Sequence, residues 1–185
     1  MKKILSFLWE ISKIIIIALL IVVPIRYFLF QPFIVRGASM EPSFHSGDYL
    51  IIDEISYRFR QPQRGEVIVF KYPHAPSQRY IKRIVGLPGE IIEIKEGQIF
   101  ISQDGKEFQP LNELAYLYDS PLTSGNLDIT LNESEYFVLG DNRLFSSDSR
   151  HWGAVAENYI VGRALFRAWP PQALAKINAP IYQTP

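Results

Sequence analysis

A serine among small residues is the first candidate for chemistry in this chain of 185 residues. Ser39 lies in the hexapeptide 37–42, GASMEP, whose small neighbours would let a substrate backbone approach closely. They would also leave a backbone N–H free near the hydroxyl, which suits stabilisation of an oxyanion. A surface turn explains the hexapeptide as well, so Ser39 alone does not establish a reaction.

A lysine in an apolar strand pattern is the second candidate. Alternation along residues 80–85, YIKRIV, places Tyr80, Lys82 and Ile84 on one face of a strand. A lysine acts as a general base only when it is neutral, and desolvation lowers its ordinary pKa of about 10.4 by up to roughly 3–5 units. The alternative interpretation of this segment is an exposed strand lysine.

A loop dense in hydrogen-bonding groups is the third candidate. Residues 140–150, GDNRLFSSDSR, contain two aspartates and two arginines. Their spacing does not match a calcium-binding EF-hand loop. The alternative is a long polar loop whose surface ion pairs contribute little.

The rest of the sequence excludes the more familiar chemistries. The chain has no cysteine, so it has no disulfide, no thiolate metal site and no cysteine nucleophile. Its histidines, His45, His74 and His151, lack the spacing of metal ligands, and no GxSxG or phosphate-binding glycine loop occurs. The chain is not basic, which disfavours nucleic acid. We therefore expect no metal, no cofactor and no nucleic-acid partner.

The elements that must position these residues begin with an unusual N-terminus. Of residues 1–30, 22 are hydrophobic, and their net charge of +3 leaves −3 for the remainder. The apolar run Ile14–Ile25 is extended by aromatic residues on both sides, toward the about 20 residues that a membrane span needs. Lys2 and Lys3 would face the cytoplasm, with the rest of the chain outside. A cleaved signal peptide is disfavoured because bulky residues follow Arg26, and a core helix is the third possibility.

Beyond residue 30 the sequence predicts β structure. Short runs rich in Ile, Val, Tyr and Phe are separated by turn residues, and no long helical period follows the first segment. These runs are Asp48–Ile55, Glu66–Tyr72, Tyr80–Val85, Glu90–Ile94, Gln98–Ile101, Glu135–Leu139 and Tyr159–Phe166. The predicted fold is therefore mainly β, with an N-terminal transmembrane helix followed by a β-barrel or sandwich-like domain.

The expected organisation has four parts. Residues 1–30 form a membrane anchor, and residues 31–96 and 135–185 form the two parts of the β-domain. Residues 97–134 form an inserted cap, because most of this stretch is polar, rich in turn residues and weakly periodic.

Taken in order, these segments resemble type I signal peptidases, which are membrane-bound serine-lysine endopeptidases. The blocks that carry the resemblance are GASMEPSF, GDYLIIDEISY, RGEVIVFKYP, RYIKRIVGLPGE and GDNRLFSSDSRHWGAV. The resemblance implies cleavage of signal peptides from exported preproteins by a catalytic domain outside the plasma membrane, or at a thylakoid membrane where one exists. The implied partners are these signal peptides and the lipid bilayer, without a cofactor.

The resemblance also implies roles for individual residues. Ser39 matches the nucleophile, Lys82 the general base, and Ser146 the serine that orients the lysine. The residues implied to form supporting ion pairs are Arg83, Asp141, Asp148 and Arg150. Those implied to form the substrate cleft and its shallow apolar pockets are Met40, Phe33, Val35, Phe44, Tyr80 and Ile81.

Three positions depart from the family pattern. Gly37 stands where some members have a serine that assists the oxyanion hole, so we expect a replacement for a donor worth about 2.7–4 kcal/mol. Leu144 and Phe145 replace a frequent Asp-Asn pair, and Ser43 replaces a common threonine.

Two other functions fit parts of the sequence. A self-cleaving serine-lysine protease of the repressor type shares the two catalytic residues, but such proteins lack an anchor and the GDNR block. A membrane-anchored β-domain that binds exported peptides without cutting them would not require Ser39, Lys82 and Ser146 together.

Overall fold

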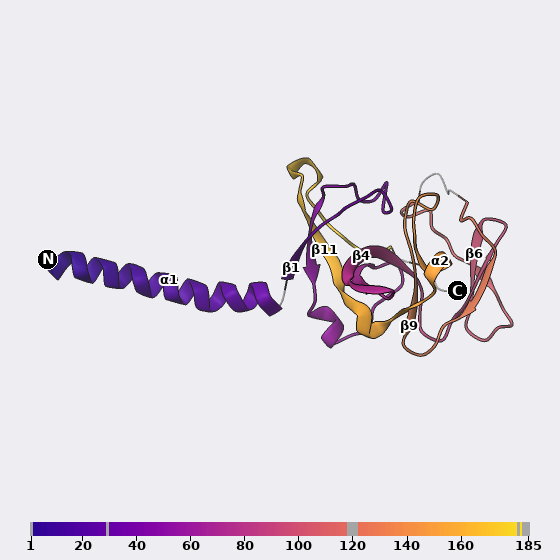
Figure 1. Ribbon diagram of the computed structural model, residues 1–185, viewed down its shortest axis with the longest axis horizontal. Coiled ribbons are helices and arrows are strands. Elements are labelled where there is room, and N and C mark those ends of the chain that lie inside the picture. The colour runs from indigo at the N-terminus through magenta and orange to yellow at the C-terminus, as the bar shows by residue number, and fades with distance from the viewer. Residues whose placement is uncertain (1, 29, 118–121, 181, 183–185) are drawn as a thin grey trace.

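A computed structural model describes residues 2–28, 30–117, 122–180 and 182 (Figure 1). A long helix, α1 (Lys2–Phe28), extends away from a domain built of strands. The strands are β1 (Phe30–Ile34), β2 (Tyr49–Asp53), β3 (Val67–Tyr72), β4 (Ala75–Gly86), β5 (Ile91–Lys95), β6 (Gln98–Ser102), β7 (Gln109–Pro110), β8 (Leu127–Thr130), β9 (Glu135–Leu139), β10 (Val155–Ala156), β11 (Ile160–Trp169) and β12 (Ala175–Lys176). A one-turn helix, α2 (Ser149–Trp152), and three 3₁₀ turns, Ser56–Arg58, Glu157–Tyr159 and Pro171–Ala173, complete the described elements.

The prediction of a mainly β fold is confirmed. Each of the seven predicted strands is present within a few residues of its expected bounds, as β2, β3, β4, β5, β6, β9 and β11. The strands that the sequence pattern missed are short or interrupted. β1 contains Pro32, which lacks a backbone N–H, and lies at the end of its sheet, where such a residue is tolerated.

Two antiparallel sheets form the domain. The larger follows the order β1-β2-β11-β3-β4-β9-β10, with β12 beside β11, and the smaller follows β7-β6-β5-β8. β4 is central in the larger sheet because it pairs with β3 on one side and with β9 on the other. Ile68 faces Lys82 in the first pairing, and Arg83 faces Leu139 in the second. The register of β4 is therefore fixed from both sides.

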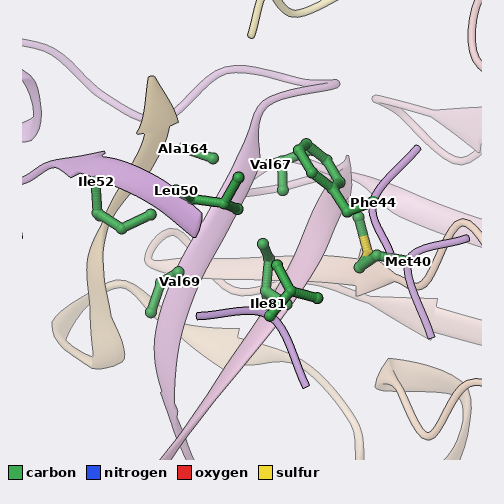
Figure 2. Close-up of a cluster of buried hydrophobic side chains, with 9 residues drawn as sticks. Met40, Phe44, Leu50, Ile52, Val67, Val69, Ile81 and Ala164 are labelled. Carbon is green, nitrogen blue, oxygen red and sulfur yellow. The ribbon is translucent and has the colours of Figure 1, made fainter. Parts of the chain in front are cut away.

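Three buried hydrophobic clusters hold the sheets in place. One cluster, shown in Figure 2, joins the first sheet to the chain after Ser39 and includes Met40, Phe44 and Ile81. A second lies between the two sheets and contains side chains from β4, β5, β6 and β9. A third packs around β3, β4 and β9. β4 contributes to all three clusters, which makes it the structural centre of the domain.

Most of the N-terminal segment 1–30, which was predicted to be a transmembrane helix, forms α1. All the side chains of α1 that the structure describes are exposed to solvent. Within the residues described, however, no helix has the combination of length and hydropathy needed to cross a membrane.

Candidate active site

The turn that carries Ser39 is held by its neighbours in the sequence. Gly37 has φ of +86°, a backbone conformation that glycine adopts without strain, and it reverses the chain after β1. The amide of Glu41 donates to the Ala38 carbonyl, which closes a tight turn around Ser39. Met40 is fully buried in the core, so the residue after Ser39 fastens this turn to the sheet.

Lys82 projects from β4 to this turn. Its Nζ lies 2.7 Å from Ser39 Oγ and donates a second hydrogen bond to the Ile81 carbonyl at 2.9 Å. The side chain is almost completely buried, and burial lowers the pKa of Lys82 from 10.5 to about 8, against the opposing charges of Asp148 and Asp141. A substantial fraction of this lysine is therefore neutral near pH 8, and its amine lies within hydrogen-bonding distance of a hydroxyl.

The loop 140–150 packs directly against the serine turn. Asn142 donates its backbone N–H to the Ser39 carbonyl and its side-chain Nδ2 to the Ala38 carbonyl, both at 3.1 Å. Gly140 approaches so closely that a Cβ there would lie 2.1 Å from Ser146 Oγ and 2.4 Å from the Ser39 carbonyl oxygen. The position of the loop therefore constrains the position of Ser39.

Two buried ion pairs support this arrangement. Arg83 donates to both carboxylate oxygens of Asp141, at 2.8 and 2.6 Å. Arg150 donates to Asp148 at 2.8 Å, and Asp148 accepts a further bond from the Gly140 amide. Burial alone would raise the pKa of Asp148, but its hydrogen bonds and ion pair with Arg150 hold that pKa below the ordinary value. Both pairs join the loop to a fixed element, β4 or α2.

Ser146, which the resemblance implies to orient Lys82, is buried beside Gly140, and no hydrogen bond joins it to Lys82 in the part of the chain that the structure describes. Ser146 contributes to the lowered pKa of Asp148, so its hydroxyl faces that carboxylate. The second partner of Lys82 is instead the carbonyl of Ile81, its neighbour on the same strand.

A groove of about 750 Å³ opens at Ser39 and Lys82. Three of the predicted substrate-contacting residues, Phe33, Tyr80 and Ile81, line it. The other three, Val35, Met40 and Phe44, are buried in the first cluster and are not among its lining residues. The lining residues that the sequence did not single out as contacts are Pro32, Ile34, Arg36, Gly37, Ala38, Gln78, Arg79, Phe145 and Ser147.

The chemistry of the groove is that of a serine activated by a lysine. A neutral amine at hydrogen-bonding distance from a hydroxyl can accept its proton and leave a nucleophilic oxygen. In the part of the chain that the structure describes, no group of three or more His, Asp or Glu side chains lies close enough to hold a metal ion.

Known proteins resemble the chain over most of its length. The family model described as signal peptidase, peptidase S26, matches residues 8–169. A probable signal peptidase I-2 from Synechocystis sp. is 36% identical over 166 residues, which cover 87% of this chain and 73% of that protein. A signal peptidase I from Bacillus caldolyticus is 39% identical over 168 residues, which cover 83% of this chain and 87% of that protein.

A solved structure is also similar. The crystal structure of a signal peptidase I from Enterococcus faecalis has 32% sequence identity and a TM-score of 0.47, over 56% of this chain and 97% of that one. The family match and the sequence relatives confirm the resemblance found in the sequence blocks. The chain is therefore a peptidase and belongs to the signal peptidase family, peptidase S26.

Proposed function

We propose that this protein cleaves signal peptides from exported preproteins, with Ser39 as the nucleophile and neutral Lys82 as the general base. The observation that carries the proposal is the 2.7 Å contact between Lys82 Nζ and Ser39 Oγ, made by a buried lysine whose pKa is lowered to about 8. The groove beside this pair has room for an extended peptide.

The reaction proceeds in two stages that share one base. In the first, Lys82 takes the Ser39 proton while Oγ attacks the scissile carbonyl, and the resulting ammonium returns the proton to the departing amine. In the second, Lys82 takes a proton from water, the hydroxide attacks the acyl-enzyme ester, and Ser39 recovers its proton as it leaves. Each stage forms an oxyanion, and the backbone N–H of Ser39, which has no acceptor within the described residues, is placed to stabilise it.

Ser146 is proposed to orient the amine of Lys82, as the family resemblance implies. The support is that Ser146 is buried beside Gly140, which abuts the Ser39 carbonyl. Arg83, Asp141, Asp148 and Arg150 are proposed to support the geometry without touching substrate, because their charged groups are satisfied by one another.

Substrate selection is proposed to arise from shallow apolar contacts with small side chains before the cut. Phe33, Tyr80 and Ile81 would make those contacts because they line the groove. Val35, Met40 and Phe44 would act indirectly. They belong to the buried cluster that also contains Ile81 and packs against Phe33, so they would hold these two groove residues in position. Residues 31–96 and 135–185 together form this catalytic domain, and residues 97–134 form its cap.

We also propose that residues 1–30 hold the enzyme at a membrane through a single crossing, with the N-terminus cytoplasmic and the catalytic domain on the extracytoplasmic side of the plasma membrane. The support is the set of exposed apolar side chains on α1, among them Ile14–Ile17, which a lipid environment would cover. Lys2 and Lys3 fit the cytoplasmic end.

A cleavage assay with a purified preprotein in detergent tests the function. We expect Ser39→Ala and Lys82→Ala to lower kcat/KM by about 10³-fold or more. The matched controls, Ser77→Ala and Lys71→Ala, remove an exposed serine and an exposed lysine and should retain the wild-type rate. The activity should sediment with membranes and be released by detergent. Equal cleavage by all five proteins would refute the assignment.

A further inference from the structure

The inserted region touches the loop that holds the active site through a buried arginine. Arg143 has no exposed side-chain surface, and its guanidinium pairs with Glu113 of the insertion at 2.5 and 2.8 Å. Thr123, also in the insertion, accepts a third hydrogen bond from Arg143 at 2.6 Å. Burial alone would lower the pKa of Arg143, but Glu113 raises it above its ordinary value, so the guanidinium is charged.

A second contact from the insertion reaches β4. The ring of Tyr116 lies against the guanidinium of Arg83, 4.1 Å from its central carbon, in cation–π geometry. The Tyr116 hydroxyl donates to Glu113 at 2.6 Å, which links this contact to the first. Glu113 and Tyr116 are therefore linked to each other, and together they contact Arg143 and Arg83.

Both contacts lead to the same two residues beside the active site. Arg143 Nε donates to the Gly140 carbonyl at 3.0 Å, and Arg83 pairs with Asp141. Gly140 in turn abuts the Ser39 carbonyl and the Ser146 hydroxyl with no room for a methyl group. A chain of buried contacts thus runs from the insertion to the proposed nucleophile.

Among the described residues of the insertion, 97–117 and 122–134, none lines the groove. The contacts from Glu113 and Tyr116 lead to the Ser39 turn through Gly140 and Asp141. We propose that Glu113 is a positioning residue, which holds the 140–150 loop against the Ser39 turn through Arg143. This inference rests on the proposed serine-lysine mechanism.

Kinetics of Glu113→Gln test the proposal. The change removes the negative charge and keeps the shape, and the matched control is Glu107→Gln, an exposed glutamate of the same insertion. We expect Glu113→Gln to lower kcat by about tenfold with KM within twofold of wild type, at a temperature where its circular dichroism is native. Glu107→Gln should match wild type in both constants.

Thr123→Val is the second variant, because an unpaired buried Arg143 could prevent Glu113→Gln from folding. It removes one hydrogen bond to the guanidinium without altering charge or volume, and should lower kcat about threefold. Native kcat in a folded variant, with only a lower melting temperature, would overturn the proposal, and so would a change confined to KM. Absence of cleavage by the wild-type protein would instead refute the proposed function, and this outcome does not depend on how the variants compare with wild type in kcat and KM.

Discussion

Replacing Lys82 by methionine should stabilise the fold at neutral pH while abolishing activity. Burial lowers the pKa of Lys82 from 10.5 to about 8, so below pH 8 the folded protein carries a buried charge that the unfolded chain exposes to water. The difference of 10.5 − 8, at about 1.4 kcal/mol for each pKa unit, gives a penalty of about 3.5 kcal/mol. Between pH 8 and 10.5 the unfolded state binds more protons, so wild-type stability rises with pH.

Guanidinium unfolding in detergent, followed by tryptophan fluorescence from pH 7 to 11, measures this effect. The free energy of unfolding of Lys82→Met should exceed that of wild type by about 3.5 kcal/mol at pH 7, and the excess should shrink above pH 8. Lys71→Met, which removes an exposed lysine from the neighbouring strand β3, controls for the loss of one positive charge. For each variant the difference in the free energy of unfolding from wild type is compared across this pH range. If that difference changes with pH no more for Lys82→Met than for Lys71→Met, Lys82 is not desolvated in the folded protein.

Two further predictions concern the same site. Gly140→Ala would place a methyl group 2.1 Å from Ser146 Oγ and 2.4 Å from the Ser39 carbonyl, and the shift of about 1 Å that relieves this should cost about 10²-fold in kcat. Gly86→Ala, which crowds only core side chains, should lower the melting temperature and spare kcat. The kcat/KM of the wild type should fall about tenfold for each pH unit below the Lys82 pKa of about 8, and a flat profile from pH 5 to 9 would contradict a neutral lysine.

Local sequence patterns predicted the strands well because alternation and turn residues act over a few positions. The strand that carries Lys82 was evident from YIKRIV, and its burial follows from its central place in the larger sheet. The partner of Lys82 was not evident from spacing, since Ser39 lies 43 residues away and the two meet through tertiary packing. The family resemblance, and not periodicity, pointed to that pair.

The division of the apolar residues around the groove also depends on tertiary structure. Phe33 and Val35 would share a face of a regular strand, yet Phe33 lines the groove and Val35 is buried in the core. β1 ends at Ile34, so strand alternation does not extend to Val35. The contact between Glu113 and Arg143 could not be predicted, because the weakly periodic insertion gives no indication of which loop it meets. Long-range ion pairs of this kind leave no local pattern in a single sequence.

The register of β4 has a consequence for how the active site is specified. Lys82 and Arg83 are adjacent, and alternation sends one to Ser39 and the other to Asp141. A slip of one position would exchange them and present a guanidinium, which does not deprotonate in proteins, to the serine. The pairings with β3 and β9 fix the register of β4. They therefore determine that a lysine, which can act as a base, faces Ser39 and not an arginine, which stays charged. Catalytic identity at this position is thus encoded in backbone hydrogen bonds as much as in the side chain itself.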